Sequence, residues 1–315
     1  MSNCNVSNVA NVSFIGRPNA GKSTLMNTIL KRKLAIVSPK ANTTRFSISG
    51  VCHEQDFDIA ITDTPGLESK PQNEIGRLLV ASARGSLMFA NVVALIIDGA
   101  GPILEQDYAL YQEATQNGKH VLVVFTKTDL VSPRSKLLPK IEQIQQWGYK
   151  GVVWLVSVKS EKSIEKFKEA LREYSTDSES ECSVDSKSEC TTESESYGVN
   201  ISKGQFASEC TREHAFRLLN QEIPYGLWVS TKWLKEDEIE KDNPNKKVCE
   251  VHQTLYVLEE RHKPIVLGAK GQMIKRIGSR TRVDLMKIWN QKVRLFITVK
   301  VGEESELLKS CRVAF

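Results

Sequence analysis

Residues 16–23 read Gly16-Arg17-Pro18-Asn19-Ala20-Gly21-Lys22-Ser23 and fit the pattern GxxxxGK[ST] in full. They lie between a β-rich run, Asn11–Gly16, and a helical pattern, Lys22–Lys31. The glycines let the backbone curl so that successive amides face a phosphate, and the helix N-terminus adds its positive dipole end. Lys22 offers a charge to the β- and γ-phosphates, and the Ser23 hydroxyl can ligate Mg²⁺. A glycine turn that only caps a helix is the alternative, which the full motif in this context disfavours.

Strand and helix patterns alternate outward from this motif, which predicts an α/β fold with a doubly wound sheet. The β-rich runs are Asn11–Gly16, Ile48–Cys52, Asp58–Asp63, Val92–Asp98, Val121–Thr126 and Val152–Ser157. The helical patterns are Lys22–Lys31, Glu74–Phe89, Glu105–Gln116, Lys136–Gln145 and Ser163–Tyr174. The last four strand runs are nearly all apolar, as is typical of strands buried on both faces. The ligand site of such a sheet lies beyond the carboxyl ends of its strands.

Polar residues follow three of these strands at that edge. Asp63-Thr64-Pro65-Gly66 follows the third strand, where the carboxylate can hold Mg²⁺ through a water and the Gly66 amide can face the γ-phosphate. Thr126-Lys127-Thr128-Asp129 follows the fifth strand. A carboxylate at Asp129 can accept hydrogen bonds from the N1–H and exocyclic amine of guanine, and adenine has no matching pair of donors. After the sixth strand, Ser157-Val158-Lys159 offers a backbone amide toward the guanine O6.

These segments resemble the five nucleotide motifs of translation-factor-class GTPases, and the match is closest to the Era family. The features that carry the resemblance are GRPNAGKSTL, Asn42-Thr43-Thr44-Arg45, DTPG, TKTD and SVK. It implies that Thr44, or else Thr43, closes over the γ-phosphate and Mg²⁺, and that Asn19 helps to hold a K⁺ ion in place of an arginine finger. The implied catalytic residues are Lys22, Thr44, Asp63, Gly66 and Asn19.

The resemblance implies a full set of ligand contacts. Nucleotide contacts fall on Gly16, Arg17, Pro18, Asn19, Ala20, Gly21, Lys22, Ser23, Thr24, Asp63, Thr64, Pro65, Gly66, Thr126, Lys127, Asp129, Ser157, Val158 and Lys159. The Mg²⁺ ligands are Ser23, Thr44 and Asp63, and the K⁺ ligand is Asn19.

Three positions depart from the family pattern. Leu67 follows DTPG, so the glutamine of Ras-like GTPases is absent and slow intrinsic turnover is expected. Thr126 replaces the asparagine of NKxD, which usually ties that motif to the phosphate loop, so weaker nucleotide affinity is expected. Val158 replaces the alanine of SAx and adds bulk near the base. None of these changes removes Asp129, so guanine specificity stays the prediction.

A second pattern occupies residues 203–315. A helix is expected over Thr211–Asn220, and strands are expected over Pro224–Leu234, Val248–Leu258 and Val293–Val301. Between the last two strands, IVLGAKGxxIxxIG places a GxxG loop between helical turns, with the second helix running to Trp289. This α+β pattern looks like a type II KH module, in which the glycines let a nucleic-acid backbone approach closely. Groove-lining roles are expected for Ile265, Leu267, Ile274 and Ile277, and RNA contacts for Ile265, Gly268, Ala269, Lys270, Gly271, Ile274, Lys275 and Arg276.

The charge distribution agrees with this division. The chain of 315 residues has a net charge of 43 − 38 = +5. Residues 261–300 carry 11 Lys and Arg and one acidic residue, a net charge of +10. Such a charge suits phosphate contacts, although most charged runs of this kind form a solvated helix face. Residues 175–197 carry one basic and seven acidic residues and eight serines. We therefore expect a GTPase domain over 1–174, an acidic linker over 175–202 and a KH domain over 203–315.

The seven cysteines have no paired spacing, which argues against a disulfide scaffold or zinc finger and for a reducing compartment. Cys182 and Cys190 fall in the linker, where exposed thiols are a better interpretation than a metal site. No signal peptide or membrane span is evident. A cytoplasmic protein is expected, with peripheral contact at the inner membrane left open, and it is expected to be a monomer.

The resemblance covers all but the linker and the last residues. It implies a GTP-hydrolysing protein that binds small-subunit ribosomal RNA near its 3′ end during maturation of the 30S ribosomal subunit. Two alternatives stay open from the sequence. One is a nucleotide-gated RNA-binding module with little hydrolysis, given Leu67 and Thr126. The other is a GTPase that acts in tRNA modification, which the KH pattern and the lack of a C-terminal catalytic cysteine disfavour.

Overall fold

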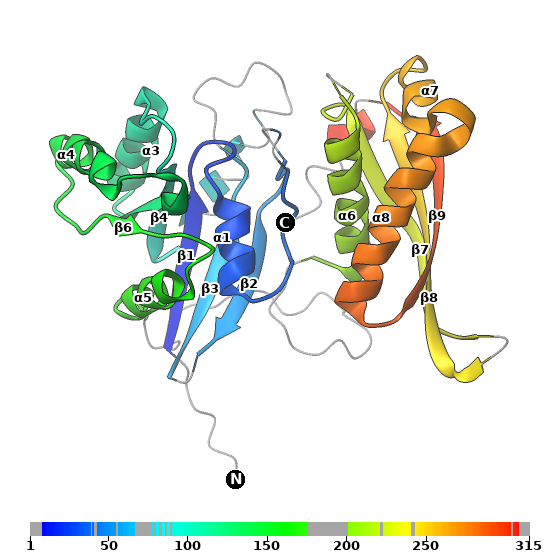
Figure 1. Cartoon of the computed structure of the whole chain (residues 1–315), viewed down its shortest axis with the longest axis horizontal. Coiled ribbons are helices and arrows are strands. Elements are labelled where there is room, and N and C mark those ends of the chain that lie inside the picture. The colour runs from blue at the N-terminus through cyan, green and yellow to red at the C-terminus, as the bar shows by residue number, and fades with distance from the viewer. Residues whose placement is uncertain are drawn as a thin grey trace, which may run out of the picture. The chain divides into compact units, whose positions relative to one another are not determined.

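The fold is taken from a computed structural model (Figure 1). It describes residues 8–38, 40, 43–54, 56–66, 77, 80–81, 84–85, 87–88, 90–175, 201–220, 223–240, 243–303 and 305–308. The chain divides into two compact units. One comprises residues 1–35 and 44–200, and the other comprises residues 36–43 and 201–315.

The N-terminal unit is built on a six-stranded sheet in the order β2-β3-β1-β4-β5-β6. Its strands are β1 (Asn8–Ile15), β2 (Ile48–His53), β3 (Phe57–Asp63), β4 (Val92–Asp98), β5 (His120–Thr126) and β6 (Trp154–Leu155). All neighbouring pairs are parallel except β2 and β3, which are antiparallel. The central strand β4 is buried on both faces, as its apolar sequence predicts.

Helices pack against this sheet on both sides. They are α1 (Lys22–Ile29), α3 (Glu105–Gln116), α4 (Leu138–Gln146) and α5 (Glu161–Arg172), with 3₁₀ turns at Thr128–Leu130 and Arg134–Leu137. Leu110 of α3 and Ile144 of α4 share a core with alternate residues of β4, whereas α1 and α5 contact β3 and each other. The doubly wound α/β prediction is therefore confirmed. The helix expected over Glu74–Phe89 lies mostly outside the described residues.

One strand is shorter than predicted. The run Val152–Ser157 forms a strand only at Trp154–Leu155, which is the edge strand β6 and pairs with β5. Val152 is 67% exposed, so the start of the apolar run does not enter the sheet. The backbone of Val156 still donates to the Phe125 carbonyl, which brings the following Ser157 to the end of β5.

The C-terminal unit is a three-stranded sheet with helices on one face. Its elements are α6 (Lys203–Leu218), β7 (Leu227–Glu240), β8 (Asn243–Val257), α7 (His262–Leu267), a 3₁₀ turn (Ala269–Gly271), α8 (Gln272–Trp289) and β9 (Lys292–Val301). In the order β7-β8-β9, the first pair is antiparallel and the second parallel. The smaller α+β domain is thus as predicted.

Helix α6 begins earlier than the sequence suggested. We expected it over Thr211–Asn220, but Ser202 caps its N-terminus with a capping box to Gln205. Residues of the first half, such as Phe206 and Ala207, are buried against the sheet. Gly204 and the short polar residues around it obscured the helical period, so packing rather than propensity extends this helix. No helix in the described part of the chain has the length and apolar character needed to cross a membrane.

Candidate functional site

The phosphate loop follows β1 and bends sharply into α1. Gly16 has φ 150°, Asn19 has φ 62° and Gly21 has φ 96°. A Cβ on Gly16 would lie 2.3 Å from the Ile96 carbonyl oxygen, so only glycine fits there. Asparagine is among the few other residues that adopt a left-handed φ at low cost, which suits Asn19. The backbone therefore has the curled form that the motif requires.

Lys22 lies inside this loop rather than outside it. Its Nζ donates to the Gly16 carbonyl at 2.9 Å and to the Arg17 carbonyl at 3.0 Å. Burial lowers the pKa of Lys22 to about 8, and the nearby Asp63 carboxylate partly opposes this shift. The side chain is only 6% exposed, so its charge is held at the centre of the loop.

Three oxygen-bearing side chains predicted to bind Mg²⁺ come together beside Lys22. The Ser23 hydroxyl donates to Asp63 Oδ2 at 2.5 Å and lies 3.1 Å from the Thr44 hydroxyl. Thr44 in turn donates to Asp63 Oδ2 at 3.4 Å. Ser23 belongs to α1, Asp63 ends β3 and Thr44 lies between α1 and β2, so only the fold brings them together.

The chemistry of this cluster fits Mg²⁺. Burial raises the pKa of Asp63 to about 6, against the opposing effects of Lys22, Ser23 and Thr44. Asp63 Oδ1 is buried and has no hydrogen-bond partner among the described residues. A carboxylate with one unpaired oxygen beside two hydroxyls matches the oxygen ligands that Mg²⁺ takes together with substrate phosphates.

The turn after β3 packs against the phosphate loop. The Thr64 hydroxyl donates to the Phe14 carbonyl at 2.7 Å and anchors the turn to β1. A Cβ on Gly66 would lie 2.8 Å from the Pro18 backbone, so the glycine allows this close approach. Pro65 between them is buried. Leu67 and Asn42, two residues of the sequence motifs, lie outside the described residues.

The segment after β5 is tied to the phosphate loop by side chains. The Thr126 hydroxyl donates to the Ala20 carbonyl at 2.5 Å, so threonine makes the link to this loop that its asparagine counterpart is expected to make. Lys127, at φ 54°, donates to the Asn19 carbonyl at 2.8 Å and to Asp98 at 2.7 Å. Asp98 ends β4 and was missed by the sequence analysis, although its place at a strand end could have indicated it.

Asp129 and the segment after β6 form one cluster. The Ser157 hydroxyl donates to Asp129 Oδ1 at 2.8 Å, and Lys159 Nζ lies 2.7 Å from Oδ2. These hydrogen bonds, the one from Lys159 first, hold the pKa of Asp129 below its usual value. The carboxylate is therefore ionised and able to accept donors on a base. Val158, between the two partners, is 39% exposed.

Arg17, a predicted nucleotide-binding residue, has its side chain directed away from the loop. Arg17 Nε donates to Asp107 Oδ1 at 2.8 Å, and the same guanidinium donates to the Pro102 carbonyl. Arg17 thus fastens the phosphate loop to the start of α3 and leaves only its backbone for a phosphate. The Thr24 carbonyl accepts from Thr28 within α1. Asp107, a fully buried carboxylate, is a second positioning residue that the sequence analysis missed.

The GxxG loop of the C-terminal unit joins α7 to α8. Gly268 has φ 71°, Lys270 φ 50° and Gly271 φ 74°. A Cβ on Gly268 would lie 2.7 Å from the Met273 Cβ, whereas one on Gly271 would meet nothing within 4 Å. The first glycine is thus needed for packing, and the second leaves open space beside the N-terminus of α8. Ala269 and Lys270, between them, are exposed.

The side chains around this loop divide into exposed and buried ones. Ile265 is 51% exposed, and Lys275 and Arg276 are exposed on the first turns of α8. Ile274 is half-buried against the core. Ile277, which we expected to line a groove, is fully buried in that core, so that prediction is wrong. Residues three apart lie on the same face of a helix, so Ile277 shares with Ile274 the side of α8 that packs on this core.

Comparison with known families agrees with both parts of the chain. A family model described as 50S ribosome-binding GTPase matches residues 11–127. A second model, described as KH domain, matches residues 222–306. The two matches include the phosphate loop of the N-terminal unit and the GxxG loop of the C-terminal unit.

Whole-length relatives were found as well. The chain is 33% identical to GTPase Era of Mycoplasmopsis pulmonis over 289 residues, 92% of each chain. It is 30% identical to GTPase Era of Caldanaerobacter subterraneus, over 92% of this chain and 91% of the relative. Among solved structures, Era in complex with MgGDPNP and nucleotides 1506–1542 of 16S ribosomal RNA has a TM-score of 0.84 at 29% identity and covers 98% of each chain. An Aquifex aeolicus Era variant bound to GDP and AlF4⁻ has the same TM-score, identity and coverage.

Proposed function

The chain belongs to the Era family of GTPases, and we propose that it uses GTP binding and hydrolysis to control its binding to small-subunit ribosomal RNA near the 3′ end. It hydrolyses GTP to GDP and phosphate, with Mg²⁺ as its cofactor. The observation that carries the nucleotide half is the convergence of Ser23, Thr44 and Asp63 beside Lys22.

In this proposal each residue of the cluster has one task. Lys22 gives up its hydrogen bonds to the two loop carbonyls and donates to the β- and γ-phosphates instead. Ser23, Thr44 and Asp63 hold Mg²⁺. Bound there, Mg²⁺ neutralises charge on the phosphate oxygens. The Gly66 amide faces the γ-phosphate. Catalysis is then positioning and electrostatic stabilisation rather than covalent chemistry by the protein.

Potassium completes the proposed site. Asn19 is exposed at the outer side of the phosphate loop, and its left-handed backbone is fixed by the bond from Lys127 to its carbonyl. We propose that its side-chain oxygen binds K⁺, whose charge takes the place of an arginine finger at the phosphates. Base selection rests on Asp129, with Ser157 and Lys159 orienting its carboxylate before guanine binds.

The C-terminal unit supplies the proposed RNA contact. A relative with the same overall fold was solved in complex with nucleotides 1506–1542 of 16S ribosomal RNA. Binding of a single strand at the GxxG loop is supported here by the open space at Gly271 and by the exposed side chain of Ile265. Three exposed basic residues lie beside them, Lys270, Lys275 and Arg276. We further propose a role in 30S subunit maturation in the cytoplasm, with domains over 1–174 and 203–315 joined by an acidic linker over 175–202.

The test has two arms on the full chain. Crosslinking in cells followed by sequencing of the bound RNA should recover the 3′ end of small-subunit ribosomal RNA, and recovery of tRNA instead would overturn the RNA assignment. GTP turnover measured with Mg²⁺ and K⁺ should exceed the rate without protein. Absence of turnover together with intact RNA recovery would favour a nucleotide-gated module that does not hydrolyse GTP.

A further inference from the structure

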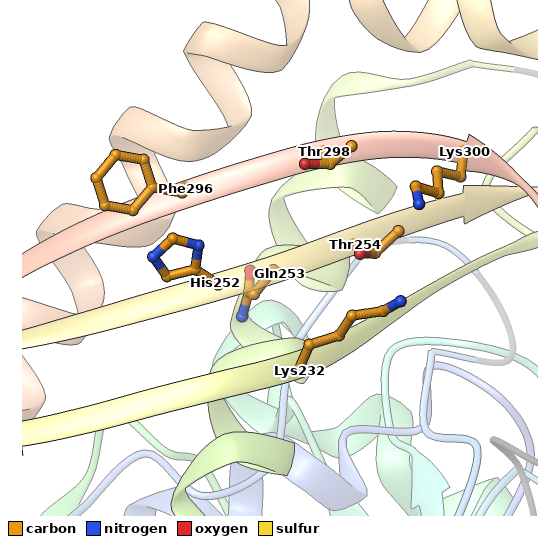
Figure 2. A pocket seen from close by; sticks show the side chains of 7 residues that line it. All are labelled: Lys232, His252, Gln253, Thr254, Phe296, Thr298 and Lys300. Carbon is orange, nitrogen blue, oxygen red and sulfur yellow. The ribbon is translucent and has the colours of Figure 1, made fainter.

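The sheet of the C-terminal unit has one face that its helices do not cover. Alternate residues of β8, such as Cys249, Val251 and Leu255, pack into the cores formed with α6 and α8. Because successive side chains of a strand point to opposite faces, His252 and Thr254 lie on the other face. We call that other face the open face. Figure 2 shows side chains from all three strands gathered there.

Part of the open face is covered by the chain itself. After β9 the Gly302 amide donates to the Val257 carbonyl at 3.0 Å. A Cβ on Gly302 would lie 2.6 Å from the Trp228 ring, which is 4% exposed and stacks on Tyr256 with ring centroids 5.0 Å apart. Gly302 therefore packs against the Trp228 end of the open face. At the other end Phe296 is 49% exposed.

A hollow of about 490 Å³ extends along the open face from Phe296 to Lys300, and its volume is within the range of small-ligand sites. It is lined by Lys232, His252, Gln253, Thr254, Phe296, Thr298 and Lys300. Lys232 is the extra residue of a β-bulge, since the register of β7 shifts between Thr231 and Trp233. Lys232 is four residues after Trp228 along β7, so alternation places it on the open face, which it shares with Lys300.

The aromatic part of the hollow is held in place. The rings of His252 and Phe296 stack with centroids 4.7 Å apart and an interplanar angle of 27°. His252 Nε2 is also 2.7 Å from Glu250 Oε1, which fixes the orientation of the imidazole. The exposed face of Phe296 is thus presented on a strand rather than on a mobile loop, and little ordering entropy is lost when a flat group stacks on it.

The polar part of the hollow suits an anionic partner. Lys232 and Lys300 are both exposed, and the described residues that line the hollow include no carboxylate. Thr298 adds an exposed hydroxyl between Phe296 and Lys300 along β9. An exposed aromatic face flanked by cations and a hydroxyl matches a nucleotide unit, with a base to stack, phosphates to pair and a 2′-hydroxyl to bond.

We infer that the open face is a second RNA-binding surface, which stacks one base of a single strand on Phe296 and binds the flanking phosphates with Lys232 and Lys300. A protein partner would need a larger apolar area than one exposed ring beside two lysines provides. The inference depends on the proposed function only for the identity of the ligand as RNA, and it concerns residues away from the GxxG loop.

The first experiment measures RNA affinity by fluorescence anisotropy, with single strands of about 4 and about 16 nucleotides. The GxxG loop alone can hold the short strand, so Phe296→Ala should leave its Kd unchanged. The long strand can reach both surfaces, so Phe296→Ala should weaken it about fivefold or more, since one stacked base contributes on that scale. Phe296→Tyr, which keeps the ring, should bind as wild type does.

The lysines are tested by salt dependence. The double change Lys232→Ala and Lys300→Ala should reduce the slope of log K against log salt for the long strand by about 1.4, or about 0.7 for each lost phosphate contact. The matched control removes Lys162 and Lys166, two exposed lysines of α5. This control variant has the same net charge as the Lys232→Ala and Lys300→Ala variant, and it should keep the wild-type slope. Equal slopes in both double variants would overturn the inference.

Direct mapping keeps the inference testable if a variant fails to fold. The wild-type chain is irradiated with a 4-thiouridine-labelled long strand and digested, and a crosslinked peptide containing Phe296 is expected. Crosslinks confined to peptides around Gly271 would overturn the second surface but leave the proposed function intact. If no RNA crosslinks anywhere, the proposed function fails as well. Stacking of free GMP with the same affinity as the long strand would overturn RNA as the occupant.

Discussion

At the scale of single residues, Asp129 is the residue that we propose selects the base. Both its oxygens are occupied, one by Ser157 and one by Lys159, so the carboxylate is oriented before any base arrives. Guanine must share or displace the Lys159 contact, which is feasible because that side chain is 73% exposed. The pairing therefore preorganises the acceptor and does not block it.

Asp129→Asn should reverse the preference of the site. The amide would present a donor to one side of the base, so GTP affinity should fall at least about tenfold and xanthosine triphosphate affinity should rise. Kd values for both nucleotides, measured with labelled analogues, check this. Asp56→Asn, an exposed carboxylate of the same unit, is the matched control and should change neither value. An unchanged GTP preference in Asp129→Asn would remove Asp129 from base recognition.

Asn19 is the proposed ligand of a K⁺ ion. We expect GTP hydrolysis to be faster in K⁺ than in Na⁺ at equal ionic strength, and Asn19→Ala to abolish that difference while GTP affinity changes little. Asn19→Asp keeps a side-chain oxygen and should retain the response to K⁺. Steady-state phosphate release in the two salts measures both effects. Equal rates for the wild type in K⁺ and Na⁺ would contradict the role of Asn19.

At the scale of elements, the two glycines of the α7–α8 turn differ in their surroundings. Gly268 packs against Met273, whereas Gly271 borders open space at the N-terminus of α8. Gly271→Asp should therefore fold but lose RNA affinity sharply, because a side chain and a negative charge fill the approach of a phosphate. Lys270→Ala should do less, reducing the salt slope by about 0.7 for a single strand. GTP binding should survive both changes.

Gly118 provides a matched control for this prediction. It has φ 68°, close to the 74° of Gly271, and a Cβ there would also meet nothing within 4 Å. Gly118→Asp thus has the same added charge and similar backbone strain in the other unit. It should bind RNA as wild type does. If Gly271→Asp also binds RNA normally in parallel titrations, the loop is a helix connector and the KH assignment of its function is wrong.

Helix α6 contains a buried ion pair on which its stability depends. Arg212 is 1% exposed, and its guanidinium binds both carboxylate oxygens of Glu209, which is 7% exposed. Arg212→Met should lower the free energy of unfolding by about 3 kcal/mol or more, since it leaves a buried carboxylate without its partner. Urea denaturation of the full chain, followed by far-UV circular dichroism, measures this.

An exposed ion pair provides the comparison. Arg172 pairs with Asp56 at 3.2 Å, with side chains 54% and 66% exposed. Arg172→Met should cost about 1 kcal/mol or less, because such pairs are screened by water. Equal destabilisation by the two arginine changes would show that Arg212 does not compensate a buried charge.

At the scale of the whole molecule, we propose that GTP hydrolysis and RNA binding are divided between the two compact units. Residues 175–197 are acidic and serine-rich in sequence and belong to the proposed linker, so we expect proteases to cut there first. Brief digestion with a glutamate-specific protease should give two fragments that meet within residues 175–202. A first cut inside either predicted domain would contradict the linker assignment, and mass spectrometry of the early products distinguishes the outcomes.

The sequence by itself determined the elements whose chemistry is local. The phosphate loop, the DTPG turn and the GxxG loop each depend on glycines and a neighbouring helix or strand, and these signals lie within a few residues. The buried strands could also be predicted from sequence. The run Val92–Asp98 is apolar up to its last residue and forms β4 over the same residues. Short-range patterns therefore sufficed for the α/β sheet, the KH-like helices and most of the candidate site.

Tertiary structure alone decided what depends on distant partners. Asp129 pairs with Lys159, and Arg17 pairs with Asp107, across long stretches of sequence. The burial of Ile277 is set by the packing of its helix against the core. The assignment of residues 36–43 to the C-terminal unit has the same origin. Such contacts are selected by the geometry of the folded sheet and its helices, and a pattern of residue types along the chain carries no record of that geometry.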